Sequence, residues 1–230
     1  MATSALKVAF CGGGNASHVG AAAVSMLGHH GRILTRRPEA FSSTMKLLCP
    51  DGEDREAELD VVSADPAEVV GDADIVMIGS PVNAYHDILE SLAPHVKEGA
   101  MVGVMFSQAH PDLMIKSRIK AKGVVPFAMQ YIPWQAKTIA FGSHGHLVGA
   151  KMELPVAVAG SAEERARVNS TLETLFEIPV QPIPFISTTI TTSNQILHPA
   201  RYYTTFQVRE RERERERDIY IHTLLGFRSV

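Results

Sequence analysis

The chain has 230 residues, of which 45% are hydrophobic and 20% are charged, and its formal net charge at pH 7 is −3. These proportions are typical of a soluble globular protein, and the length allows one large domain or one domain with part of a second. The negative charge argues against nucleic-acid binding, and no apolar run is long enough to span a membrane. With no recognisable signal peptide and only two cysteines, we expect a cytoplasmic protein with reduced thiols.

An apolar run near the N-terminus is followed by three glycines and then by an Ala-rich stretch. This order predicts a strand, a tight turn and a helix. A turn without side chains lets a pyrophosphate approach the backbone, and the helix N-terminus supplies N–H donors and a positive dipole end. The fingerprint G-x-G-x-x-G/A is imperfect, because its third position is Ser17. The expected cofactor-binding residues are Gly12, Gly13, Gly14, Asn15 and Ala16; a plain strand–helix turn without a ligand is the alternative.

The first half of the chain alternates strand-like and helix-like segments. Strands are expected at residues 31–35, 60–63, 74–81 and 100–106, and helical segments at residues 39–48, 66–70, 83–96 and 111–121. Asn83 is the expected N-cap of the third helical segment. Because parallel strands need a crossover between them, this alternation predicts an α/β, Rossmann-like doubly wound sheet.

The pattern changes near Val124, where strand-like runs follow at residues 124–134, 138–148 and 154–159. Ser161 and Glu164 have the spacing of an N-cap and a first-turn acid, which predicts a helix through Phe176. Further on, an Arg–Glu repeat at residues 209–218 offers no apolar face to bury. The expected organisation is a Rossmann dinucleotide-binding domain at residues 5–186, the start of a helical substrate domain at 187–208 and a charged low-complexity tail at 209–230.

Five further candidate residues lie at or just after the ends of three predicted strands, where open α/β sheets bind ligands. Arg36 and Arg37 follow the second strand, where an acid would bind the ribose 2′-hydroxyl of NAD and an arginine accommodates the 2′-phosphate of NADP. Ser80 and Pro81 are expected beside the cofactor, and Gln108 beside the nicotinamide or the substrate. Because Arg36 could instead stack on the adenine, NAD(H) and NADP(H) both stay open.

We predict no catalytic or metal-binding role for the remaining reactive side chains. His144 and His146 form a His-x-His pair without supporting Cys or acid ligands, so we expect a solvated hairpin and no metal site. Cys11 precedes the glycines and is expected to be a small core residue.

Several segments together resemble the opine dehydrogenases, especially the octopine dehydrogenase type. They are residues 11–15 (CGGGN), 107–109 (SQA), 132–134 (IPW), 141–142 (FG), 147–151 (LVGAK) and 196–199 (ILHP). The glycine loop is shared by many dehydrogenases, whereas the later series ending in His-Pro is more specific. The resemblance covers residues 6–203.

The resemblance implies a Rossmann domain followed by a mainly helical substrate domain. It also implies an NAD(P)-dependent reductive condensation of an amino acid with an α-keto acid such as pyruvate. The family's catalytic histidine falls on His198, as general acid–base. The acid that orients this histidine lies deep in the family's second domain, so we expect the chain to be truncated before it. A non-catalytic nucleotide-binding fragment and a reductase of the ketopantoate reductase or glycerol-3-phosphate dehydrogenase kind are the alternatives.

The segment after the expected Rossmann domain also carries a prediction about association. Ile190, Ile196, Leu197, Tyr202 and Tyr203 would expose an apolar patch without a complete second domain to cover them. Such patches promote association between chains. We therefore expect self-association through this segment.

Overall fold

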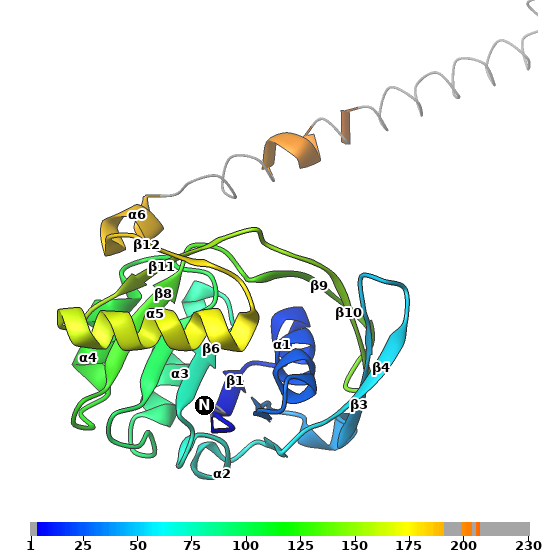
Figure 1. Cartoon of the computed structure of the whole chain (residues 1–230), viewed down its shortest axis with the longest axis horizontal. Coiled ribbons are helices and arrows are strands. Elements are labelled where there is room, and N and C mark those ends of the chain that lie inside the picture. Colours follow the sequence, from blue (N-terminus) through cyan, green and yellow to red (C-terminus); the bar gives the residue numbers. More distant parts are fainter. Residues whose placement is uncertain (1–3, 191–198, 204–205, 208–230) are drawn as a thin grey trace, which may run out of the picture. The chain divides into compact units, whose positions relative to one another are not determined.

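The computed structural model describes residues 4–190, 199–203 and 206–207 (Figure 1). The chain divides into two units, Met1–Ile190 and Thr191–Val230. The described residues of the second unit are helical. Among the described residues, no helix combines the length and the apolar character needed to cross a membrane.

Eight strands form the main sheet, in the order β12-β11-β8-β7-β6-β1-β2-β5. These strands are β1 (Lys7–Cys11), β2 (His30–Leu34), β5 (Val61–Ser63), β6 (Ile75–Ile78), β7 (Met101–Val104), β8 (Val125–Met129), β11 (Leu154–Val158) and β12 (Val180–Pro182). All neighbours from β5 to β8 run parallel, whereas β11 is antiparallel to β8. Taken in chain order, the six parallel strands lie as 3-2-1-4-5-6, which is the Rossmann arrangement. The predicted α/β, Rossmann-like doubly wound sheet is confirmed.

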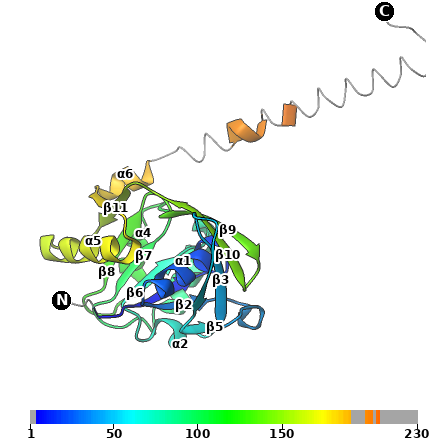
Figure 2. The same cartoon turned by 45° about the vertical axis from the view of Figure 1, so that its right-hand side comes forward.

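Helices cover both faces of this sheet (Figures 1 and 2). They are α1 (Asn15–Met26), α2 (Pro66–Val70), α3 (Tyr85–Leu92), α4 (Pro111–Arg118), α5 (Ala162–Phe176) and α6 (Phe185–Thr189), with two short 3₁₀ turns, η1 (Pro38–Ala40) and η2 (Val82–Ala84). Strand β1 divides the core: Val8 and Phe10 pack with α1 and α5, whereas Ala9 and Cys11 pack with α2, α3 and α4. This alternation follows from the two-residue period of a strand buried on both faces.

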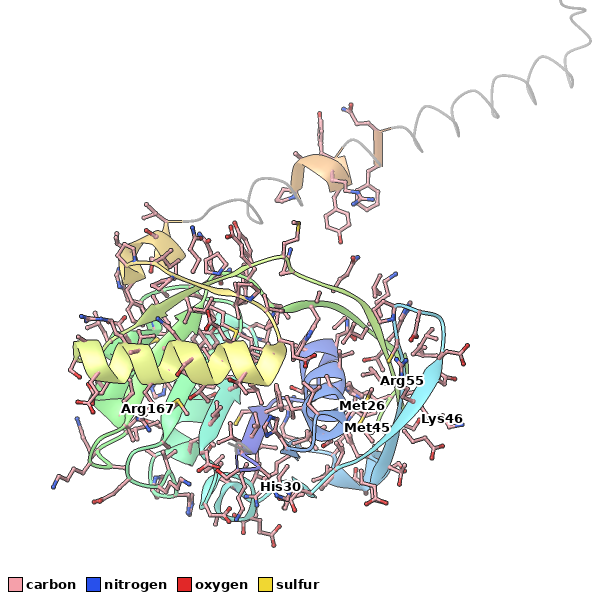
Figure 3. The ribbon with its side chains drawn as sticks, viewed as in Figure 1. Met26, His30, Met45, Lys46, Arg55 and Arg167 are labelled. Carbon is pink, nitrogen blue, oxygen red and sulfur yellow. The ribbon has the colours of Figure 1, made fainter. Side chains whose placement is uncertain are left out.

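A second, four-stranded sheet lies against α1 on the side away from the main sheet (Figure 1). Its order is β4-β3-β10-β9, from β3 (Thr44–Leu48), β4 (Asp54–Glu58), β9 (Trp134–Ala140) and β10 (His144–Ala150). Met45 on β3, labelled in Figure 3, is fully buried there. Helix α1 is therefore enclosed by two sheets, which explains its small residues: a Cβ on Gly20 would lie 2.4 Å from the Phe10 ring.

The helix predicted at residues 39–48 is wrong. Pro38–Ala40 forms only a 3₁₀ turn, and Thr44–Leu48 is a strand that pairs with β4 and with β10. Met45 and Leu47 are buried and alternate with Lys46, which is exposed, as expected of a strand with one face on the core. Pairing with β10, distant in the chain, overrides the weak local helix signal.

The expected N-cap role of Asn83 is also wrong. Asn83 lies within η2, and α3 begins at Tyr85 after Ala84, which makes no side-chain cap. In contrast, the predicted cap of α5 is confirmed as a full capping box. The Glu164 N–H donates to Ser161 Oγ (3.2 Å), and the Ser161 N–H donates to Glu164 Oε2 (2.7 Å).

Helix α6 belongs to the first unit. Thr188 is buried, and its Oγ1 accepts a hydrogen bond from Ser107 Oγ at 2.8 Å. The contact joins α6 to the segment that follows β7. The first unit therefore continues to Ile190, whereas the expected boundaries of the helical domain and of the charged tail stay predictions.

Candidate functional site

The glycine loop lies where the main sheet reverses its order. Strands β1 and β6 are parallel neighbours, and the crossovers from them proceed to opposite sides. Gly12 has φ +128°, and a Cβ there would lie 2.6 Å from Ser80 Oγ. Glycine is needed at this position for its backbone angle and for this close approach. Ser80, after β6, therefore lies beside the loop.

The N-terminus of α1 is open at Gly14. A Cβ on Gly14 would meet no atom within 4 Å, and no side chain caps the helix. Within the described residues, the N–H groups of Gly13, Gly14, Asn15 and Ala16 have no hydrogen-bond acceptor, and the first turn contains no acid. Unpaired donors at the positive end of a helix dipole fit a phosphate group. The donor set is thus suited to a pyrophosphate.

Only the backbone N–H of Asn15 is open at the loop, because its side-chain oxygen is hydrogen-bonded elsewhere. Its Oδ1 accepts hydrogen bonds from the backbone N–H (3.1 Å) and the hydroxyl (2.7 Å) of Thr138 on β9. The first turn of α1 is therefore tied to the outer sheet, which restrains the loop.

Ser17 replaces the third glycine of the fingerprint. It is fully buried, and among the described residues its Oγ has no hydrogen-bond partner. A Cβ on Gly79 would lie 3.3 Å from this oxygen. The absence of a side chain at Gly79 thus makes room for serine where the fingerprint has glycine.

The end of β2 places Thr35, Arg36 and Arg37 next to the glycine loop. A Cβ on Gly13 would lie 3.0 Å from Thr35 Oγ1. Both arginines are exposed. Neither forms an ion pair with a carboxylate of the described residues, in contrast to Arg32, which binds Asp60 and Asp72. Two uncompensated positive charges therefore lie at this edge of the site.

Pro81 and Gln108 lie at the same edge of the sheet. Pro81 is exposed and precedes η2 after β6, and Gln108 is half-buried after β7. Because β6 and β7 are parallel, their carboxyl ends face the same side as the glycine loop. The structure thus brings the predicted residues of strands β1, β2, β6 and β7 to one edge, whereas His198 lies outside the described residues.

The turn after Gln108 has a backbone feature that sequence reasoning missed. Ala109 and His110 have φ of 56° and 49°, a left-handed conformation that is uncommon outside glycine. The preceding residues are fixed, because the Tyr85 hydroxyl donates to the Phe106 carbonyl (2.8 Å) and Ser107 is bonded to Thr188. Burial raises the pKa of Tyr85 to about 12, so the hydroxyl stays protonated. The turn carries no glycine, so no residue type indicated it.

His18 is a second feature that sequence reasoning missed. The Gly142 N–H donates to His18 Nε2 at 2.8 Å, so Nδ1 carries the proton and donates to the Gly14 carbonyl at 2.9 Å. The ring packs against Phe41 and Phe141, with centroids 4.8 and 5.1 Å away. Burial lowers the pKa of His18 below its usual range. The sequence around His18 does not indicate these contacts, because their partners are distant in the chain.

The other reactive side chains, Cys11 and His144, are held in the core or within the outer sheet. Cys11 is buried, which raises the pKa of its thiol to about 12 and keeps it protonated. His144 Nε2 lies 2.9 Å from Asp54 Oδ1, across the outer sheet. Within the part of the chain that the structure describes, no three His, Cys, Asp or Glu side chains gather as metal ligands would.

Curated proteins of similar sequence include octopine and opine dehydrogenases. The chain is 27% identical to octopine dehydrogenase of Mizuhopecten yessoensis over 185 residues, which are 74% of this chain and 46% of that protein. It is 25% identical to opine dehydrogenase of Haliotis discus hannai over 66% of this chain and 42% of that protein. No family model matches the chain. The chain spans about half the length of these relatives.

Solved structures share the fold. Octopine dehydrogenase with NADH and L-arginine aligns with a TM-score of 0.72 at 24% identity, over 85% of this chain and 53% of that one. Yersinopine dehydrogenase with NADP⁺ aligns with a TM-score of 0.60 at 17% identity, over 78% of this chain and 47% of that one. A ketopantoate reductase from Ralstonia eutropha aligns with a TM-score of 0.59 at 18% identity, over 77% of this chain and 56% of that one.

The fold and the arrangement of its loops define the Rossmann-like class of domain. Within that class, the chain is a distant homologue of the octopine and opine dehydrogenases over about three quarters of its length.

Proposed function

We propose that this chain binds NAD(H) or NADP(H) and forms the nucleotide-binding part of an opine dehydrogenase-like oxidoreductase. The observation that carries the proposal is the open approach at Gly14, where unpaired N–H donors lie at the switch point of a Rossmann sheet. The pyrophosphate would accept hydrogen bonds from the N–H groups of Asn15 and Ala16. Gly12 and Ser80 would form the floor of the loop.

The proposed reaction is the reductive condensation of an amino acid with an α-keto acid such as pyruvate. Support comes from the distant homology, and from octopine dehydrogenase structures that contain L-arginine or pyruvate. A reduced nicotinamide, when bound, would supply the hydride. Gln108, at the carboxyl end of β7, would contact the substrate. His198 would act as general acid–base: it would polarise the keto group and donate a proton to the keto oxygen, which leaves as water when the amino nitrogen bonds to that carbon.

The first test separates binding from turnover in the whole chain. NADH and NADPH are titrated by protein fluorescence quenching, and oxidation is then followed with pyruvate and a panel of amino acids that includes L-arginine. We expect saturable binding, and turnover only when the amino acid and the keto acid are both present. Binding without turnover would favour a non-catalytic nucleotide-binding protein. Turnover of a keto acid alone would favour a reductase of the ketopantoate reductase kind.

A second measurement tests the role of His198. The variant His198→Gln should retain cofactor affinity and lose at least about a hundredfold in turnover, since general acid–base catalysis contributes roughly that much. If His198→Gln turned over at the rate of the unchanged chain, the acid–base assignment would be wrong.

A further inference from the structure

The hairpin that joins β9 to β10 reaches the glycine loop from the outer sheet. A Cβ on Gly13 would lie 3.9 Å from Phe141 Cζ, at the hairpin tip, and 3.0 Å from Thr35 Oγ1, after β2. Three segments that are distant in the chain therefore meet beside the loop. Phe141 is 40% exposed, so part of its ring stays accessible.

The hairpin tip is held in place by several contacts. Its Gly142 N–H donates to His18, and its Gly142 carbonyl accepts from the Ser42 N–H at 2.8 Å. The Phe141 ring packs edge-on against Phe41, with centroids 5.2 Å apart. These contacts tie the hairpin tip to the buried helix α1 and to the β2–β3 connection, so they hold Phe141 beside the glycine loop.

Arg37 lies over this ring. Its Cζ is 4.5 Å from the Phe141 centroid, which is a cation–π arrangement. A guanidinium held over an aromatic ring keeps its N–H donors available for a phosphate, and it loses less side-chain freedom when it binds. Arg37 forms no ion pair with a described carboxylate, and Arg36 beside it adds a second free positive charge.

We propose that Phe141 and Arg37 form the recognition site for the 2′-phosphate of NADP(H), with His18 as the residue that positions the hairpin. This rests on the proposed cofactor binding and deepens it by choosing between the two dinucleotides. At the end of the second Rossmann strand an acid selects the ribose 2′-hydroxyl, whereas an arginine accommodates the phosphate. Here the segment from Leu34 to Arg37 contains no acid.

The experiment is isothermal titration of the whole chain with NADPH, NADH and two half-molecules, 2′,5′-ADP and 5′-AMP. Each pair differs by the 2′-phosphate alone. We expect tighter binding of NADPH and 2′,5′-ADP. Arg37→Ala should weaken these two by about ten- to a hundredfold, the range for charge-assisted hydrogen bonds. Phe141→Ala should weaken them by about two- to fivefold, the value of an exposed cation–π contact.

Matched variants separate recognition from folding. Phe141→Trp should retain the affinity for 2′,5′-ADP, whereas Phe141→Leu, which keeps an apolar side chain but has no ring, should weaken it by about the same two- to fivefold as Phe141→Ala. Arg167→Ala removes the same charge from α5 (Figure 3), where Arg167 donates to the Gly99 carbonyl near the amino end of β7. That variant should bind all four ligands as the unchanged chain does.

Two outcomes would overturn the proposal while cofactor binding stands. One is equal affinity of the unchanged chain for 2′,5′-ADP and 5′-AMP. The other is an equal loss for both ligands in Arg37→Ala or Phe141→Leu. Failure of the unchanged chain to bind any of the four ligands would instead reject the proposed function itself.

Discussion

His18 joins the N-terminus of α1 to Gly142 at the tip of the β9–β10 hairpin. Its two ring nitrogens are both used, one donating to the Gly14 carbonyl and one accepting from the Gly142 N–H. The ring is therefore neutral, and a second proton would break the bond to Gly142. Because burial lowers the pKa of His18, this bond is retained at neutral pH.

This relationship predicts a pH dependence of stability. The pKa of His18 lies below its unfolded value of about 6.5 in the folded chain, so on acidification the unfolded state takes up the proton first. Stability should therefore be lost as pH falls below about 6.5. The measurement is urea denaturation between about pH 5 and 8, in comparison with His18→Gln, which can accept the Gly142 hydrogen bond without titrating. Parallel pH profiles of the two proteins would contradict the prediction.

Gly14→Ala should separate cofactor binding from stability. The backbone of Gly14 is extended (φ −90°, ψ −178°), and its Cβ would enter open space, so we expect a stability loss of about 1 kcal/mol or less. The added methyl would occupy the approach of the pyrophosphate, and affinity for either dinucleotide should fall by at least about tenfold. Gly149→Ala, which also adds a Cβ to open space, is the matched control and should bind normally. Unchanged affinity of Gly14→Ala would argue against the site.

Gly142→Ala should be more destabilising than its backbone angle alone explains. Gly142 and Gly52 have similar φ values, +74° and +87°. A Cβ on Gly52 meets nothing within 4 Å, whereas a Cβ on Gly142 would lie 1.8 Å from the Ala40 carbonyl oxygen. Gly52→Ala should cost about 1–2 kcal/mol of unfolding free energy, from the left-handed conformation only. Gly142→Ala should cost clearly more, as measured by denaturant unfolding; equal losses would show that the hairpin tip is not held against Ala40.

The exposed apolar residues near the end of the described chain predict self-association. Ile190, Tyr202 and Tyr203 are 65%, 61% and 65% exposed. Ile196 and Leu197, which belong to the same predicted apolar segment, lie outside the described residues. We expect the double variant Ile190→Ser, Tyr203→Ser to lower the average mass seen by light scattering as concentration rises. Met152→Ser, at an isolated residue that is 93% exposed, is the control and should leave the mass unchanged.

Local sequence was sufficient for the elements whose signals lie within a few residues. The turn from Gly12 to Gly14, the buried strand at β6 and the capping box of α5 depend on neighbouring residues, so their residue types indicated them. The rule that parallel strands end at one edge of the sheet then placed Arg36, Ser80 and Gln108 on the side of the loop.

Tertiary structure decided what depends on contacts between distant segments. The strand at Thr44–Leu48 was predicted as a helix. Its hairpin with β4 around Pro50–Gly52 is a local feature that the helix prediction overlooked, whereas its pairing with β10 has no local signal. The bond from Gly142 to His18 spans 124 residues, and the contact of Arg37 with Phe141 crosses from the main sheet to the outer one. The sequence by itself determined the class of fold and the glycine loop, since both follow from short-range patterns. Which side chains surround that loop was decided only by packing, because long-range neighbours leave no periodicity in the chain.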